Sequence, residues 1–315
     1  MRTRAPRTRR SFARSKGRRR SYAPSRRRYA TKKRTYRKKA SMMRSRKSLL
    51  NVTSRKKRNT MLTWSNTTSS GASQTTAPGT AFVSGAPGTI GYFLFHVTAQ
   101  NLSATGGGSN VIINVAERTA TTCFMRGFSE NIRIQTNSGI PWFHRRICFC
   151  SRGGSPFTQI AAGDSQTQPS GNSIDTSNGM ERLWLNSSVN AQPNTIAAQY
   201  GYLFKGVSGV DWSDVILAPV DTARVDLKFD KTWTIRSGNA NGTIAERKLW
   251  HPMNKNLVYD DDENGEAEQS SYFSVDTKQG MGDYYILDLI TPGLGGSTSD
   301  AINIYSNSSL YWHER

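Results

Sequence analysis

The residues of this chain that could do chemistry are concentrated near its start, in the stretch RRRSYAPSRRRYATKKRTYRKK (residues 18–39). Twelve of its 22 residues are Lys or Arg, none is acidic, and tyrosines recur at seven-residue intervals as Tyr22, Tyr29 and Tyr36. Unpaired cations favour a polyanion, because each phosphate contact releases a condensed counterion. An aromatic ring adds stacking on an unpaired base, about 1–3 kcal/mol for each base, without sequence preference. These residue types together predict binding to single-stranded nucleic acid.

The same composition extends over residues 1–58, here termed the basic arm. The arm holds 26 of the 43 Lys and Arg residues and no Asp or Glu, and the first acidic residue of the chain is Glu117. Residues 59–315 carry 17 basic and 22 acidic residues, a net charge of −5. The arm has few apolar residues to bury and its like charges repel, so we expect it to be disordered without a polyanion.

The predicted nucleic-acid-binding residues are the basic residues of the arm and its three spaced tyrosines. They are Arg2, Arg4, Arg7, Arg9, Arg10, Arg14, Lys16, Arg18, Arg19, Arg20, Tyr22, Arg26, Arg27, Arg28, Tyr29, Lys32, Lys33, Arg34, Tyr36, Arg37, Lys38, Lys39, Arg44, Arg46, Lys47, Arg55, Lys56, Lys57 and Arg58.

The charge of the arm has two interpretations besides nucleic-acid binding. A nuclear localisation signal needs only about five to eight basic residues, so we expect the arm to bind a nuclear import receptor as well as nucleic acid. Binding to an acidic protein or a membrane surface is the remaining alternative.

The seven-residue spacing of the tyrosines continues through Met43 and Leu50, but Pro24 blocks a helix in the first repeat. Accidental spacing is the simpler interpretation, and the alternative is a helix over residues 26–50 that forms when phosphates screen the charge.

The sequence carries no recognised motif for catalysis or metal binding. It has no GxxxxGK[ST] phosphate loop and no GxSxG nucleophile elbow. Its four histidines lack the HxH or HExxH spacing of metal ligands; they are His96, His144, His251 and His313. We therefore expect neither enzymatic activity, nor a metal site, nor a cofactor.

The three cysteines predict buried thiols. Cys123, Cys148 and Cys150 are an odd number, and the CxC spacing of the last two fits neither a metal knuckle nor a redox motif. On a strand Cys148 and Cys150 would share one face, where small buried thiols are ordinary. This pattern indicates a reducing compartment.

One acidic run, DDDENGEAE (Asp260–Glu268), begins like a calcium-binding loop. A calcium loop needs Glu at its twelfth position, but this sequence has Ser271 there. A solvated loop is the simpler interpretation, and a nuclease metal site is the alternative.

No secretory signal or membrane span is apparent in the sequence. No apolar core follows the basic start, and no apolar run approaches the length that crosses a bilayer. We therefore expect no membrane partner.

Alternating apolar and polar residues predict strands after residue 88. Residues 59–88 are rich in Ser, Thr, Gly and Ala, which predicts a linker. In TIGYFLFHVTA, the side chains of Phe93, Phe95 and Val97 share one face, as in a half-buried strand. In RVDLKFDKTWTI the expected apolar face is Val225, Leu227, Phe229, Trp233 and Ile235. Little helical periodicity is visible. The predicted fold is all-β: a single jelly roll over residues 89–315, an antiparallel sandwich of two sheets and about eight strands.

Several segments resemble the capsid proteins of genomoviruses, small viruses with circular single-stranded DNA. They are the basic arm, TTCFMRGFSENIRIQT, PWFHRRICF, LWHPMNKNLVYDDDE and the terminal LYWHER. More distantly the pattern is similar to geminivirus and circovirus capsid proteins. RRICF and WHPMNKNLVYDDDE are the specific parts of the resemblance, which extends over the whole chain.

The resemblance implies a jelly roll that assembles into a small icosahedral shell of about 60 copies. It also implies encapsidation of single-stranded DNA with the arm inward, a virion location, a host nuclear phase with a host import receptor, and no catalytic activity. Sixty arms of 26 charges would bring roughly 1,560 positive charges inside, enough for a genome of a few thousand phosphates.

Two rival classes explain part of the sequence. A non-viral histone-like or ribosomal nucleic-acid-binding protein explains the arm, but not a strand-rich body that lacks a second basic patch. An enzyme with a basic targeting tail is the third class, and it lacks a catalytic motif.

Overall fold

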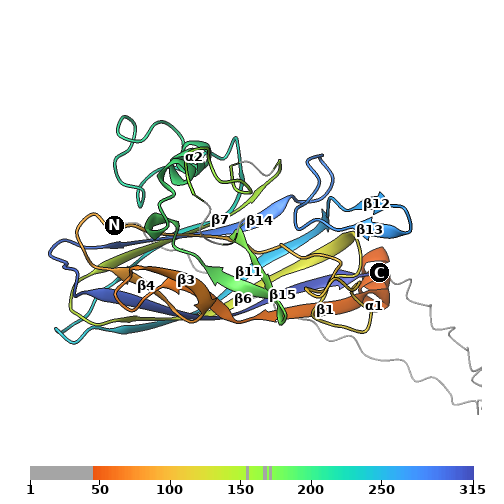
Figure 1. Ribbon diagram of the computed structural model, residues 1–315, viewed down its shortest axis with the longest axis horizontal. Coiled ribbons are helices and arrows are strands. Elements are labelled where there is room, and N and C mark those ends of the chain that lie inside the picture. The colour runs from red at the N-terminus through yellow and green to blue at the C-terminus, as the bar shows by residue number, and fades with distance from the viewer. Residues whose placement is uncertain (1–44, 154–155, 166–168, 170–171) are drawn as a thin grey trace, which may run out of the picture. The chain divides into compact units, whose positions relative to one another are not determined.

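Strands dominate the computed structural model, which describes residues 45–153, 156–165, 169 and 172–315 (Figure 1). Residues 46–315 form one folded unit, so the unit begins inside the segment that the sequence assigns to the basic arm.

Two antiparallel sheets, each built on four long strands, form the sandwich. The first sheet has the order β1–β15–β6–β11 and the second has the order β10–β7–β14–β5. The strands of the first sheet are β1 (Arg55–Met61), β15 (Ala301–Glu314), β6 (Thr122–Thr136) and β11 (Ile244–Val258). The strands of the second are β10 (Asp226–Ile235), β7 (Trp142–Ser151), β14 (Asp283–Pro292) and β5 (Gly91–His96).

The order of these eight strands is that of a jelly roll. The first and last long strands of the chain, β1 and β15, are paired neighbours in the first sheet. The chain then crosses repeatedly between the sheets, so each sheet is assembled from strands distant in sequence. The predicted all-β jelly roll is confirmed.

Shorter elements extend the sandwich. A third sheet contains β3 (Ser73–Pro78), β2 (Thr63–Thr67), β9 (Gly179–Trp184) and β8 (Ile174–Thr176), with β2 and β9 parallel. The remaining elements are α1 (Arg46–Thr53), β4 (Ala81–Ser84), the 3₁₀ turn η2 (Ser187–Val189), α2 (Pro193–Leu203) and the hairpin β12 (Asp262–Asn264) and β13 (Ala267–Gln269). The composition of residues 59–88 predicted a linker, but these residues form the end of β1 and all of β2, β3 and β4.

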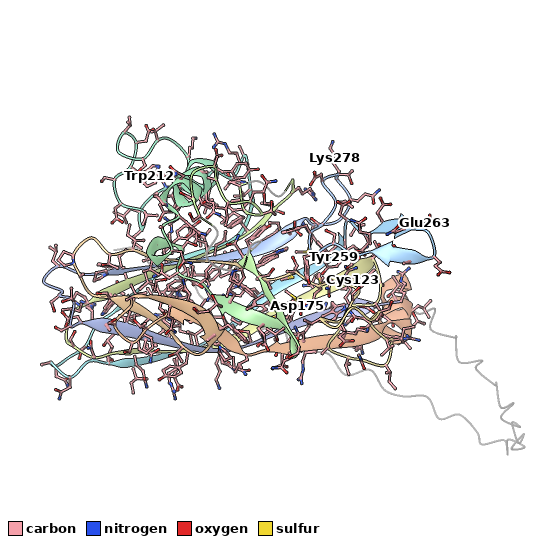
Figure 2. All side chains as sticks on the ribbon, in the orientation of Figure 1. Cys123, Asp175, Trp212, Tyr259, Glu263 and Lys278 are labelled. Atoms are coloured by element: carbon pink, nitrogen blue, oxygen red, sulfur yellow. The ribbon has the colours of Figure 1, made fainter. Side chains whose placement is uncertain are left out.

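The apolar core lies between the two large sheets. Phe95 and Trp142 of the second sheet and Phe128, Ile304 and Trp312 of the first are all at most 1% exposed. All three cysteines are free and buried, as the sequence predicted, and Cys148 and Cys150 share the inner face of β7. Figure 2 shows Cys123 inside the layers.

A further layer covers the outer face of the second sheet. The ring of Phe149 on β7 contacts that of Phe157 at 5.1 Å between centroids, and Leu203 and Phe204 at the end of α2 belong to the same buried cluster. Trp212 lies in this layer (Figure 2). The structure describes no comparable layer over the outer face of the first sheet, where Lys248, Trp250 and Asn307 are exposed.

Two local expectations are wrong. A bulge between Leu227 and Phe229 reverses the faces of β10, so Leu227 packs against the covering layer and Phe229 against the inter-sheet core. The sequence analysis predicted no helix over α2. Pro193 is the first residue of this helix, and proline is common there because the backbone N–H it lacks would have no partner within the helix.

Candidate nucleic-acid interface

Most of the predicted nucleic-acid-binding residues lie outside the described part of the chain. These are the predicted basic residues from Arg2 to Arg44, together with Tyr22, Tyr29 and Tyr36. The described members are Arg46 and Lys47 in α1, and Arg55, Lys56, Lys57 and Arg58 in β1.

The strand β1 sorts its basic residues onto two sides. It pairs with β15 from Arg55 opposite Glu314 to Met61 opposite Ser308, so successive side chains point to opposite faces of the sheet. Lys56 and Arg58 are exposed on the outer face, while Lys57 is 3% exposed and points inward. Arg55, at the start of the strand, is exposed. Lys56 and Arg58 are therefore placed to meet a ligand.

Lys57 is held inside the fold. Its Nζ lies 3.2 Å from Glu314 Oε2 and donates hydrogen bonds to the carbonyl of Glu117 (2.7 Å) and to Thr119 Oγ1 (3.1 Å). Burial opposes the charge of Glu314, but hydrogen bonds from Thr119 and Trp312 and the charge of Lys57 lower its pKa. A lysine bound in this way does not face a ligand.

Three further basic residues lie on the same outer face as Lys56 and Arg58. Arg126 and Arg133 belong to β6, and Lys248 belongs to β11. All three are exposed. Sequence reasoning missed them because they lie far from the basic arm and outside any long basic run, although their outward positions alternate with buried apolar residues such as Ile132 and Ile134.

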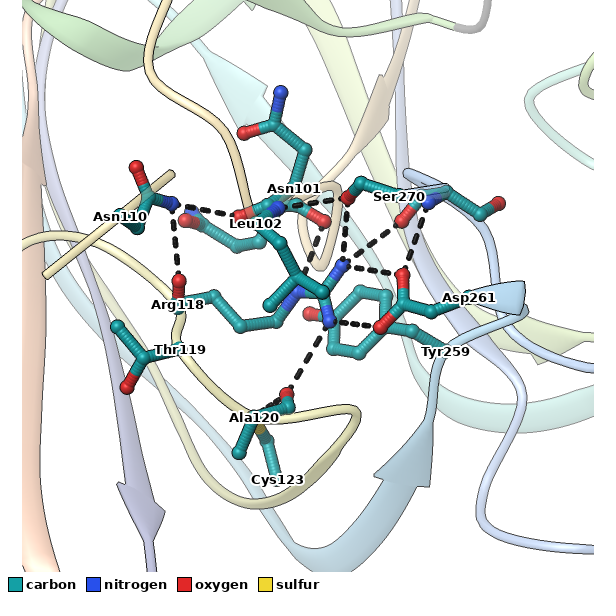
Figure 3. A network of polar contacts seen from close by, with 12 residues as sticks. Asn101, Leu102, Asn110, Arg118, Thr119, Ala120, Cys123, Tyr259, Asp261 and Ser270 are labelled. Carbon is teal, nitrogen blue, oxygen red and sulfur yellow. Dashed lines mark hydrogen bonds and ion pairs between the residues drawn. The ribbon is translucent and has the colours of Figure 1, made fainter. Parts of the chain in front are cut away.

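The acidic run is partly built into the fold. Arg118 is fully buried and forms a bidentate contact with Asp261, with distances of 2.5 Å and 2.9 Å between nitrogen and oxygen (Figure 3). The Arg118 guanidinium also lies 3.7 Å from the centre of the Tyr259 ring and donates to the carbonyls of Gln100, Ala120 and Ser271. Asp261 thus fastens the start of the acidic run to the loop before β6.

The rest of the acidic run is at the surface. Asp260, Asp262, Glu263, Glu266 and Glu268 are exposed. Glu263 stands on the hairpin of β12 and β13 at the periphery of the unit (Figure 2). The run is therefore solvated at these five carboxylates, but it forms a hairpin where a loop was expected, and the side chain of Asp261 is 1% exposed.

A second ionic network lies in the inter-sheet core. Arg146 on β7 contacts both Asp288 on β14 (2.7 Å) and Glu130 on β6 (2.5 Å). Arg182 on β9 contacts the same two carboxylates at 2.7 Å from Glu130 and 3.2 Å from Asp288. Burial opposes both carboxylate charges, yet the arginines hold the pKa of Glu130 and of Asp288 below the usual range.

His144 belongs to this core network. Its Nε2 lies 2.7 Å from Asp288 Oδ1, and its Nδ1 lies 2.6 Å from Arg247 Nη1. Since Arg247 only donates, His144 Nδ1 accepts and His144 Nε2–H donates to Asp288. Burial lowers the pKa of His144. The network links four strands of the two large sheets, β6, β7, β11 and β14, with β9 of the third sheet. Its groups satisfy one another, which is the pattern of a structural network and not of a site with an open ligand position.

The side chains that could act as nucleophiles or metal ligands do not converge in the described part of the chain. Burial raises the pKa of the three thiols, that of Cys150 to about 12, so they are poor nucleophiles. No three His, Cys, Asp or Glu side chains are grouped to hold a metal ion within the described residues.

No protein-family model matches the chain, and no curated protein matches it. None of the described helices has the length and apolar character needed to cross a membrane.

Proposed function

We propose that this chain is the capsid protein of a virus with a circular single-stranded DNA genome. About 60 copies assemble into a small icosahedral shell, and the basic arm condenses the genome inside it. The observation that carries this proposal is the division of charge. Twenty-six basic residues and no acidic ones precede residue 59, and residues 59–315, which hold the jelly roll except for the start of β1, carry a net charge of −5.

The chemistry of the arm suits a single strand without regard to its sequence. Its Lys and Arg side chains neutralise phosphates and release counterions, while Tyr22, Tyr29 and Tyr36 stack on unpaired bases. The acidic balance of residues 59–315 limits competition from the rest of the chain for the genome. The same arm carries the nuclear localisation signal, and a host import receptor binds this signal to carry the protein into the host nucleus.

Exposed apolar side chains support assembly into a shell. The loop before β6 exposes Val111, Ile112, Ile113 and Val115, by 52%, 57%, 85% and 60%. This loop lies beside β1, because the amide of Arg58 donates to the carbonyl of Val115 at 2.9 Å. A cluster of exposed β-branched side chains is typical of a protein–protein contact, and another copy of the chain is the partner that a closed shell supplies.

The resemblance to genomovirus capsid proteins also supports the proposal, because its specific segments form strands of the fold. RRICF falls in β7, and WHPMNKNLVYDDDE runs from β11 to the acidic hairpin. In this proposal the protein has no enzymatic activity and no cofactor.

Electron microscopy of the purified full-length chain, with single-stranded DNA added, tests the proposal. We expect uniform closed particles. Monomers or small oligomers spread along the nucleic acid would contradict it and favour a histone-like or ribosomal nucleic-acid-binding protein.

A further inference from the structure

The outer face of the first sheet carries aromatic rings on its central strands. Residues paired across an antiparallel ladder point to the same side of the sheet. Trp312 and Glu314 point inward, so the residues next to them on β15, Tyr311 and His313, point outward. The outward rings are Phe124 on β6, Trp250 on β11, and Tyr305, Tyr311 and His313 on β15.

These rings contact one another. The centroids of Trp250 and Tyr311 are 5.7 Å apart, and those of Phe124 and His313 are 6.0 Å apart. Gly127 makes room for the indole, because a Cβ added there would lie 2.7 Å from Trp250 Cζ2. Trp250 is nonetheless 50% exposed. A large ring held in place by its neighbours and half open to solvent is a ready stacking surface.

Cations flank the rings. In the register of the sheet Lys56 lies opposite His313 and Arg58 lies opposite Tyr311, both at the β1 edge. Lys248 stands on β11 at the opposite edge of the sheet. Between the edges, the Arg133 guanidinium lies 4.5 Å from the centre of the Tyr305 ring.

Negative charge is scarce on this face. The four strands β1, β15, β6 and β11, all of them described, contain three carboxylates, and Glu130 and Glu314 are buried. Glu246 is the one that points outward, against the five cations Lys56, Arg58, Arg126, Arg133 and Lys248. The charges of Arg126 and Lys56 reach the rings, since burial and then these two cations lower the pKa of His313.

We propose that this outer face, termed the ring face, is a second binding surface for single-stranded nucleic acid. Unpaired bases stack on Trp250, Tyr311 and the other rings, while the flanking cations hold the phosphates. From Tyr305 to His313 the rings extend over about 27 Å along β15, which is long enough for several nucleotides. This inference rests on the proposed function and adds a binding surface that the arm does not contain.

A single strand fits this face better than the other candidate occupants. A duplex keeps the faces of its bases stacked inside and offers the rings nothing. The arm of the same chain has the same sign of charge as the ring face and is repelled by it. The basic residues at the end of the arm belong to β1, at the edge of the first sheet, so Lys56 and Arg58 border the ring face.

Ring substitutions in the full-length chain test the stacking. Fluorescence anisotropy with a labelled oligothymidine strand measures affinity over a range of salt concentrations. The double variant Trp250→Ala and Tyr311→Ala should bind about 30-fold or more weakly, because each lost stack is worth about 1–3 kcal/mol. The slope of log affinity against log salt should not change, since rings release no counterions. The variant Trp250→Phe and Tyr311→Phe keeps both rings and should keep most of the affinity.

Charge substitutions test the flanking cations. The double variant Arg58→Gln and Lys248→Gln should reduce the magnitude of the salt slope by about 1.4, at about 0.7 for each phosphate contact to a single strand. The matched control Lys205→Gln and Lys278→Gln removes two exposed lysines outside the ring face, one after α2 and one in the loop before β14, and should leave the slope unchanged. Figure 2 labels Lys278. Equal slopes in both variants would overturn the proposal.

Photo-crosslinking of the unaltered chain is independent of any effect of substitution on folding. A strand containing 5-bromouracil should crosslink to peptides that include Trp250 or Tyr311, as well as to the arm. Crosslinks confined to residues 1–58 would overturn the ring face and leave the arm proposal standing. Failure of the full-length chain to bind the strand at all would overturn both. Ring-face variants that change self-association but not strand binding would identify the face as a contact between copies and overturn this inference.

Discussion

Lys57 of β1 and Glu314 of β15 form an ion pair between the first and the last long strand of the jelly roll. Lys57 Nζ lies 3.2 Å from Glu314 Oε2, and both side chains are 2% exposed. The lysine stands between Lys56 and Arg58, which are exposed, so neighbouring positions in one basic run have different roles. The end of the basic arm is part of the fold, and its alternation decides which cations are free to bind a ligand.

Replacement of Lys57 by Met should lower the free energy of unfolding by about 3–5 kcal/mol, because it leaves Glu314 buried without its cation. Lys56→Met is the matched control, since this neighbour is exposed, and it should change stability by less than about 0.5 kcal/mol. Urea unfolding of both variants measures the difference. Equal midpoints for the two variants would refute the role of the Lys57 pair.

The two ends of the basic arm should respond differently to truncation. Deletion of residues 1–44 should leave the thermal midpoint close to that of the full chain, because the folded unit begins at Arg46. Deletion of residues 1–58 removes four of the seven residues of β1 and the Lys57 pair, so the midpoint should fall by several degrees or the chain should fail to fold. Differential scanning calorimetry compares the three proteins. The same midpoint after both deletions would show that β1 contributes no stability.

Substitution of single carboxylates in the acidic run by Asn should lower the stability of the fold at Asp261 but not at its exposed neighbours. Asp261→Asn weakens the bidentate contact with buried Arg118 and should destabilise the fold by about 3 kcal/mol. Asp260→Asn and Asp262→Asn, at exposed positions, should stay within about 0.5 kcal/mol of the unaltered chain. Chemical denaturation measures all three. A stable Asp261→Asn protein beside a destabilised Asp262→Asn protein would reverse the assignment.

Acidification should destabilise the fold through buried histidines. Burial, and then the charge of Arg146, lower the pKa of His251 to about 4. Below pH ~6.5 the unfolded chain binds a proton at His251 that the folded chain does not, so stability falls as the pH drops from about 6.5 to about 4. The loss amounts to about 3 kcal/mol for this group and is complete once the folded chain is also protonated.

The variant His251→Gln should therefore show a flatter dependence of unfolding free energy on pH between about 6.5 and 4. The buried carboxylates Glu130 and Asp288 act in a lower window, because their contribution is lost only as the pH falls below about 4. Denaturation curves at several pH values separate the two windows. An unchanged slope in His251→Gln would show that His251 titrates normally in the folded chain.

The strand pattern of the sequence was enough to predict the class of fold. In β5, Phe93 and Phe95 face the inter-sheet core as their alternation indicated, while Tyr92 and Leu94 pack under the covering layer. The helix α2 also left a signal, because Ile196, Tyr200 and Leu203 follow Pro193 at helical spacing. The rest of the chain shows the alternation of strands, so no helix was predicted from this short pattern.

The polar features were harder to predict, because their partners are distant in sequence. Arg146 lies 142 residues before Asp288 and pairs with it only after β7 and β14 are neighbours. Likewise Arg118 and Asp261 are 143 residues apart. The ring face depends on four strands in register, so neither Trp250 nor Tyr311 could be assigned to it from spacing within one segment.

The central claim is that the arm packages single-stranded DNA inside a closed shell of this protein. The most direct measurement is the amount of nuclease-protected DNA in particles purified by density gradient, for the full chain and for the chain without residues 1–44. The full chain should protect single-stranded DNA, and the truncated chain should protect close to none while its folded unit stays intact. Equal amounts of protected DNA from both proteins, or no protected DNA from the full chain, would contradict the account.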